Sequence, residues 1–155
     1  MKKIAILYET YRPVIDSLKS LGYVTDCYTS LNFSPDDYDL VISTDDSKKT
    51  PFRVLTSHLS LLPAFADEEP VKTAVLSGVK VTGVTVYYSN PETILAQYPV
   101  FIYNDAHYDE IYQELTYIEQ VLLTTVANKI LKNEPFESKT LLGSKHCGGC
   151  SGCSK

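Results

Sequence analysis

The stretch FRVLTSHLSLLPAF, residues 52–65, decides how this sequence is interpreted. Its first six residues alternate as the side chains of a short strand do, and His58 follows where that strand ends. A turn that stops at Pro63 comes directly after it. An imidazole at the carboxyl end of a strand is a common position for chemistry in an α/β protein. The same pattern also fits a half-buried histidine that only packs in an apolar turn.

The residues before this stretch predict the beginning of a parallel sheet. A continuous apolar run over residues 3–8 is typical of a buried central strand, and a helix is expected over 13–21. Alternating or apolar runs predict further strands over 23–28 and 39–43. This order of elements predicts an α/β protein with a Rossmann-like, mostly parallel twisted sheet that is flanked by helices. In that sheet His58 should lie at a strand's carboxyl end beside a cleft.

The residues after this stretch predict two more strands and two helices. Pro70 and Gly78 suit the first turn and the end of a helix. Strands over 79–89 and 94–103 should form a hairpin, and Pro99 places the second strand at an edge or beside a bulge. A long helix is expected over 105–132, because apolar side chains recur at steps of three and four. They are Ile111, Leu115, Ile118, Leu122, Val126 and Ile130.

The composition limits the class of protein and its partners. A chain of 155 residues with 44% hydrophobic and 21% charged residues predicts one globular domain, over 1–137, followed by a linker and tail over 138–155. The net charge of -5 and the scattered basic residues argue against nucleic-acid binding. No apolar run approaches the length of a membrane span, and the first strand is too short for a signal peptide. A cytoplasmic protein with reduced cysteines is therefore expected.

The segment around His58 resembles a family signature. Its letters H-x-S-L-L-P-x-F are similar to the N-x-H-P-S-L-L-P motif of the folate-dependent formyltransferases, which include glycinamide ribonucleotide formyltransferase and the catalytic domain of methionyl-tRNA formyltransferase. The letters AVLSGVKVTGVTV at 74–86 and ILAQ at 94–97 resemble the family's GVKVTG and IIAQ segments. The resemblance covers about residues 54–97 and implies the formyltransferase fold.

The resemblance also implies a set of site residues. Formyl transfer from 10-formyltetrahydrofolate to a small amine forms an oxyanion that needs hydrogen-bond donors and a group that moves one proton. In the family, an asparagine and a histidine two residues apart face this oxyanion, and a later aspartate orients the histidine. His58 corresponds to the histidine, Thr56 to the asparagine and Glu92, in a shortened loop, to the aspartate. Ser60 is expected to hold the turn through a bond to the backbone.

Departures from the family pattern shape the functional hypothesis. The turn after the first strand has Glu9 and no glycine, so it does not resemble the phosphate loop of the ribonucleotide-binding members. Arg12 there either meets an anion or is solvated. The interval at 44–51, which lines the pterin pocket in the family, is short. We therefore predict a divergent relative that is weak or inactive in formyl transfer; the alternative is an active formyltransferase of one-carbon metabolism that uses His58.

The end of the chain, KHCGGCSGCSK, predicts a metal site. Cys147, Cys150 and Cys153 are spaced as C-x-x-C-x-x-C, with His146 beside the first of them. Thiolates at this spacing bind zinc or an Fe–S cluster, and the fourth ligand would be His146, a partner protein or a second chain. The alternative is a flexible tail that binds metal adventitiously. The expected partners are thus a small-molecule substrate and a protein that shares or receives the metal centre.

Overall fold

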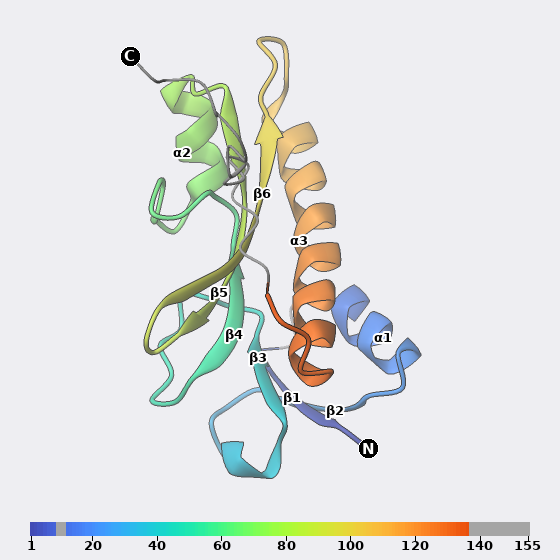
Figure 1. Cartoon of the computed structure of the whole chain (residues 1–155). Coiled ribbons are helices and arrows are strands. Elements are labelled where there is room, and N and C mark those ends of the chain that lie inside the picture. The colour runs from blue at the N-terminus through green and yellow to red at the C-terminus, as the bar shows by residue number, and fades with distance from the viewer. Residues whose placement is uncertain (9–11, 137–155) are drawn as a thin grey trace, which may run out of the picture.

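Six strands form one mixed sheet in the computed structural model, which describes residues 1–8 and 12–136 (Figure 1). The strand order is β2-β1-β3-β4-β5-β6. The first four of these strands are parallel, and β5 and β6 are antiparallel to their neighbours. The strands are β1 (Lys3–Leu7), β2 (Val24–Tyr28), β3 (Leu40–Ser43), β4 (Val54–His58), β5 (Val81–Ser89) and β6 (Thr93–Phe101). This arrangement confirms the predicted Rossmann-like fold and the predicted hairpin.

Two helices cover one face of the parallel part of the sheet. The helix α1 (Arg12–Ser20) and the second half of α3 (Tyr108–Leu131) pack on the apolar side chains of β1, β3 and β4. The first half of α3 and the helix α2 (Pro70–Ser77) pack together with β5. A short 3-10 turn, η1 (Pro35–Asp37), precedes β3. The long helix α3 therefore contributes to both apolar clusters and reaches the end at which α2 lies (Figure 1).

Aromatic side chains cover the other face of β1, β3 and β4. Tyr28 and Phe33 stack with ring centroids 4.4 Å apart, and Phe33 contacts the rings of Tyr38 and Phe52 edge-on. The hydroxyl groups of Tyr28 and Tyr38 lie 2.5 Å apart, and Tyr38 donates to the carboxylate of Asp26 at 2.9 Å. These rings therefore shield one face of the parallel strands.

The ends of the helices follow the expected sequence signals. Pro70 occupies the first turn of α2, and Gly78 ends that helix in the left-handed region, with φ of 70°. Acids occupy the first turn of α3 and Lys129 its last turn, as the helix dipole favours. The His107 backbone N–H donates to the Glu110 carboxylate at 3.3 Å at the start of α3.

Three details of the structure differ from, or refine, the sequence prediction. Pro99 lies on β6, which is the edge strand, and a register shift occurs between Val86 and Tyr87 on its neighbour. The long helix begins at Tyr108, three residues later than predicted. Its buried line also differs from the predicted stripe, because it includes a carboxylate. The buried residues are Ile111, Leu115, Glu119, Leu123, Val126, Ala127 and Leu131.

Part of the predicted organisation falls outside the described residues. The linker and tail predicted over 138–155 lie there, with Cys147, Cys150, Cys153 and His146, and so does Glu9. The predicted domain boundary near residue 137 therefore stays a prediction. Among the residues that the structure describes, no helix has the length and apolar character needed to cross a membrane.

Candidate functional site

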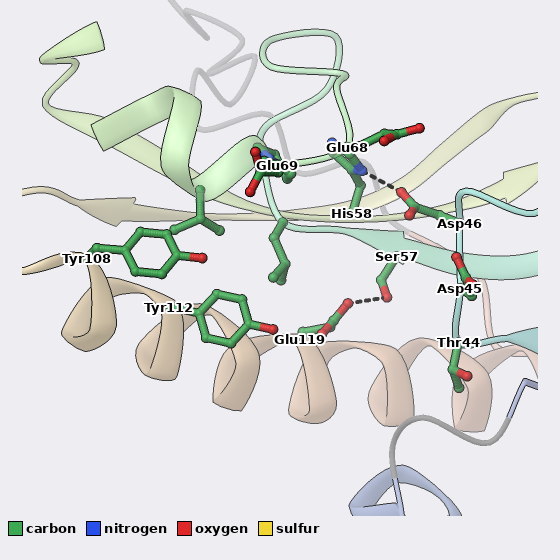
Figure 2. A pocket seen from close by; sticks show the side chains of 13 residues that line it. Thr44, Asp45, Asp46, Ser57, His58, Glu68, Glu69, Tyr108, Tyr112 and Glu119 are labelled. Carbon is green, nitrogen blue, oxygen red and sulfur yellow. Dashed lines mark hydrogen bonds and ion pairs between the residues drawn. The ribbon is translucent and has the colours of Figure 1, made fainter. Parts of the chain in front are cut away.

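Two adjacent parallel strands bring the candidate site together at their carboxyl ends. β3 and β4 are paired through Ile42 and Leu55, so the loop that follows Ser43 meets the end of β4 at His58. A cavity of about 390 Å³ opens at this edge, as the sequence predicted for His58 (Figure 2). Its lining comprises Thr44, Asp45, Asp46, Ser57, His58, Leu59, Glu68, Glu69, Pro70, Val71, Tyr108, Tyr112 and Glu119.

His58 is buried and uses both of its ring nitrogens. Its side chain is 9% exposed, and its Nδ1 contacts the Asp46 carboxylate (Figure 2). Its Nε2 lies 2.9 Å from the backbone carbonyl of Phe65. Because both partners are acceptors, both ring nitrogens donate, and His58 is an imidazolium in this arrangement. Burial lowers the pKa of His58, but the bonds to Asp46 and Phe65 together outweigh it, and the pKa is raised above 6.5.

The raised pKa of His58 predicts a pH-dependent cost for Asp46→Asn. A raised folded-state pKa contributes stability that is present below the unfolded value of 6.5 and lost as the pH rises through the folded value. We expect the variant to lose about 1 kcal/mol of unfolding free energy near pH 5 and much less near pH 9. Urea unfolding at the two pH values measures this difference.

Asp45→Asn is the matched control for that measurement. The Ser47 hydroxyl bond lowers the pKa of Asp45 below 3.8, so its contribution is complete at both pH values. The cost of Asp45→Asn should therefore be the same near pH 5 and near pH 9. An equally pH-independent cost for Asp46→Asn would contradict the charged pair.

A second carboxylate reaches the cavity from the long helix. The Ser57 hydroxyl donates to Glu119 Oε1 at 2.6 Å, and Figure 2 shows the two side chains facing each other between β4 and α3. Glu119 is 4% exposed and lies between Leu115 and Leu123 on the buried line of α3. Buried carboxylates need hydrogen-bond partners, and Ser57 supplies one. Ser57 and His58, which are consecutive on β4, thus bind the carboxylates of Glu119 and Asp46 respectively.

The lining of the cavity is strongly acidic. Among the described residues that line it, the only basic group is His58. Five carboxylates contribute to the same lining, those of Asp45, Asp46, Glu68, Glu69 and Glu119. One wall is aromatic: the rings of Tyr108 and Tyr112 stack with centroids 5.8 Å apart. Carboxylates with low-dielectric walls concentrate a negative potential, so the cavity favours cations over anions.

Thr56, the predicted partner of His58, does not reach the cavity. It lies two residues earlier on β4, and so on the same face of the sheet, as the spacing predicted. Its side chain is 2% exposed and is absent from the cavity lining. Its hydroxyl has no hydrogen-bond partner among the described residues. Thr56 therefore does not supply a donor to the cavity in this arrangement.

Glu92, the predicted equivalent of the family aspartate, lies at the other end of β4. β5 is antiparallel to β4, with His58 opposite Thr85 and Val54 opposite Ser89. The hairpin turn that carries Glu92 follows Ser89, so it lies beyond the start of β4, roughly 13 Å along the strand from His58. Glu92 does not line the cavity. The carboxylate that reaches His58 is Asp46, from the loop between β3 and β4.

Ser60 and the two segments of the resemblance hold the turn after His58. The Ser60 hydroxyl donates to the Ala64 carbonyl at 2.6 Å, which is the predicted role. Thr85 Oγ1 donates to the Ser60 carbonyl at 2.7 Å and accepts from the Leu62 N–H at 3.0 Å. The Gln97 amide donates to the Leu62 carbonyl at 2.9 Å. The S-L-L-P turn is thus fastened to both strands of the hairpin.

Sequence reasoning missed three of the groups around His58. Asp46 carries a usable signal, because it closely follows a buried parallel strand, where sites of α/β proteins gather. Glu119 carries another, because it stands four residues from both Leu115 and Leu123 on an apolar period. The Phe65 carbonyl belongs to the backbone and leaves no signal in the sequence. Among the described residues, no group of His, Cys, Asp and Glu side chains is arranged to hold a metal ion.

Comparisons with known proteins agree on one family. The family model described as formyl transferase matches residues 36–127, more than half of the chain. Formyltetrahydrofolate deformylase of Haemophilus influenzae is 35% identical over 75 residues, which cover 48% of this chain and 26% of that protein. The matched segments span only 19% to 35% of the lengths of the curated relatives.

Solved structures share the fold at low sequence identity. Phosphoribosylglycinamide formyltransferase from Bacillus halodurans is 19% identical, with a TM-score of 0.69 over 93% of this chain and 100% of the solved one. The formyltransferase PseJ from Anoxybacillus kamchatkensis is 20% identical, with a TM-score of 0.70 over 89% of this chain and 82% of the solved one. PseJ was solved with a UDP-linked formamido sugar and tetrahydrofolate.

Proposed function

This chain belongs to the formyl transferase family, and from that premise we propose that it is a divergent member that binds a small amine beside His58 and performs little or no folate-dependent formyl transfer. One observation carries the proposal: both ring nitrogens of His58 are bonded within the protein. A histidine in this state has no lone pair to accept a proton from an attacking amine, and the Phe65 carbonyl occupies its Nε2–H until a ligand displaces it.

Among the residues that the structure describes, Thr56 and Glu92, the predicted partners of His58 in formyl transfer, do not line the cavity. An oxyanion is stabilised by donors that point at the position where charge develops, and the loss of one donor costs about 10²–10³ in rate. Thr56 is outside the cavity lining, and its hydroxyl replaces an amide that the family signature has at this position. The proton-moving and the oxyanion-binding roles are therefore both weakened.

The lining also disfavours the cofactor of the family. Relatives are named for formyltetrahydrofolate or were solved with tetrahydrofolate, whose glutamyl tail carries carboxylates. Five carboxylates and a single imidazolium line the cavity here, so a polyanionic folate meets like charge. The comparisons support a folate-using family, and the acidic lining argues only that folate binds weakly in this cavity. A phosphorylated amine meets the same repulsion.

A small organic amine suits the same lining. An ammonium group is attracted by the carboxylates that line the cavity. Of these, Glu69 already pairs with Lys72 at 3.2 Å and Glu119 accepts from Ser57, so Glu68 carries the main share of this attraction. The ring pair of Tyr108 and Tyr112 offers a face for a cation–π contact. A cavity of about 390 Å³ is in the range of small-molecule sites. The proposed ligand is therefore a small molecule with at least one ammonium group and no phosphate.

A binding titration combined with a transfer assay tests this function. Calorimetric titration should detect 1,4-diaminobutane and fail to detect 1,4-butanediol, which has the same length and no charge. Formyl transfer from 10-formyltetrahydrofolate to the diamine or to glycinamide ribonucleotide should be undetectable, and Thr56→Asn should not restore it. A turnover near the usual ~1–10³ s⁻¹, or equal binding of diamine and diol, would overturn the proposal.

One observation favours the alternative, an active formyltransferase that uses His58. The contact with Asp46 preserves the histidine–carboxylate pair that the family resemblance implies, although the carboxylate comes from a different loop. In that case the bond from His58 Nε2 to Phe65 must open and the imidazolium must also lose its proton, so that His58 can accept one during transfer. The transfer assay distinguishes the two, because only the alternative gives turnover.

We propose in addition that Cys147, Cys150 and Cys153, with His146, bind a soft metal ion or an Fe–S cluster. These residues lie outside the described part of the chain, and the support for the proposal is the C-x-x-C-x-x-C spacing of the thiols.

A further inference from the structure

Phe65 holds an uncommon backbone conformation at the point where it meets His58. Its φ is 51°, in the left-handed region that a bulky side chain rarely adopts. This conformation turns its carbonyl toward His58 Nε2, at 2.9 Å. His58 is largely buried where it borders the cavity, and its Nδ1 is held by Asp46. Asp46 thus binds the Nδ1–H of His58, and the Phe65 carbonyl accepts a hydrogen bond from the remaining donor, Nε2–H.

Residues 65 and 66, which carry this carbonyl, lie between two turns that are each held by hydrogen bonds. On one side, Ala64 donates its N–H to the Leu61 carbonyl at 3.0 Å and accepts from the Ser60 hydroxyl. On the other side, the Glu69 N–H donates to the Asp67 carboxylate at 2.9 Å. Within the described part of the chain, the Ala66 N–H makes no backbone hydrogen bond. Rotation at residues 65 and 66 can therefore move the carbonyl while both turns stay in place.

The chemistry of the contact suggests what replaces it. The Phe65 carbonyl is an amide oxygen, which is the same acceptor that a formamide or another small amide presents. A charged N–H donor binds either oxygen with a similar hydrogen bond. A formylated amine would place its formamide oxygen on His58 Nε2 and its ammonium group among the carboxylates at Glu68 and Glu69.

We propose that the Phe65 carbonyl is an internal ligand of His58, which the amide oxygen of a formylated amine displaces. This inference rests on the proposed function of the cavity as an amine site. Displacement breaks the hydrogen bond between the Phe65 carbonyl and His58, which costs free energy. Part of this cost is offset because Phe65 leaves the left-handed region and its backbone strain is relieved. A ligand without a hydrogen-bond acceptor therefore cannot displace the Phe65 carbonyl from His58, whereas a ligand with an amide oxygen can.

Ala66→Pro is the variant that opens the contact. A proline disfavours helical backbone in the residue before it and drives that residue to extended φ, which removes the Phe65 carbonyl from His58. Ala66→Ser is the matched control, because serine places no such restriction on residue 65. Nitrogen-15 NMR of the imidazole, assigned with His58→Gln, should show roughly 10- to 100-fold faster exchange of the Nε2 proton in Ala66→Pro and no change in Ala66→Ser.

Ligand binding completes the test, with N-formyl-1,4-diaminobutane as the probe. Its affinity should be roughly 10- to 100-fold higher for Ala66→Pro than for the wild type and Ala66→Ser. Equal affinities, or an unchanged exchange rate in Ala66→Pro, overturn the internal ligand. If no protein binds the probe or the diamine while exchange still rises in Ala66→Pro, the proposed function fails and the His58–Phe65 contact is supported.

A measurement on the wild type covers the case in which Ala66→Pro does not fold. The carbonyl carbon of Phe65, labelled with carbon-13, should shift when the formylated probe saturates the protein, because its hydrogen bond to His58 is lost. The unformylated diamine should leave that resonance in place. The same resonance position with both probes overturns the proposal.

Discussion

Gly83→Ala should destabilise the protein by about 3 kcal/mol or more, at the upper end of the range for overpacked sites. A Cβ at this position of β5 would lie 2.2 Å from the Tyr98 carbonyl oxygen and 2.6 Å from Leu61 Cδ2. The first of these atoms belongs to the backbone of the paired strand β6, so it moves only if the hairpin opens. The midpoint of urea unfolding measures the loss.

Gly78→Ala is the control for this prediction. Its φ is 70°, and an added Cβ there meets no atom within 4 Å. Gly78→Ala should therefore lower the free energy of unfolding by about 1 kcal/mol, because alanine disfavours this positive φ, with no contribution from a clash. If Gly83→Ala costs no more than Gly78→Ala, the close approach of the two strands at Gly83 is wrong. The clash also reaches the site, because Leu61 belongs to the turn that carries the chain from His58 to Phe65.

The position of Gly83 explains why two segments of the family resemblance occur together. The G of V-T-G at Gly83 makes room for Leu61 of the S-L-L-P turn, and Gln97 of I-L-A-Q bonds the carbonyl of Leu62 from the neighbouring strand. Thr85, two residues after Gly83, accepts and donates in the same turn. These letters describe one packed unit, the turn on its hairpin, which a chain retains for structural reasons even where its catalytic groups change.

Local patterns predicted most of the fold. The apolar run of β1 reflects burial of both faces of that strand, and most of β5 is buried on both faces as well. The apolar spacing along α3 reflects burial of one helix face. Pro70 and Gly78 marked the ends of α2 because their backbone preferences are local. Element ends shifted by one to three residues, since the last turn of a helix depends on its tertiary contacts.

The site was less predictable because its contacts join separate elements. Glu92 was matched to the family aspartate by its place along the chain, but the antiparallel register of β5 carries the turn to the opposite end of β4 from His58. Asp46 reaches His58 only because β3 and β4 are neighbours in space. Glu119 was overlooked because the long helix was interpreted as an apolar stripe, although it contributes a buried acid opposite Ser57.

Replacing the three thiols of the tail should abolish metal binding. Thiolates are the ligands preferred by zinc, copper(I) and Fe–S centres, and three of them stand two residues apart at Cys147, Cys150 and Cys153. For the triple Cys→Ser variant we expect the apparent zinc affinity to fall on the order of 10³-fold or more. Metal analysis of anaerobically purified protein, followed by titration with zinc, measures the change.

Two controls separate the tail from the rest of the chain. Cys27→Ser, at an exposed position on β2, should leave zinc uptake unchanged. Deletion of residues 145–155 should abolish zinc uptake and leave the urea midpoint of the domain unchanged, because the buried line of α3 ends at Leu131. Zinc binding by the wild type should weaken as the pH falls, since protons compete for the thiolates. Wild-type protein that takes up no metal, or a triple variant that binds as much as the wild type, would contradict the proposed site.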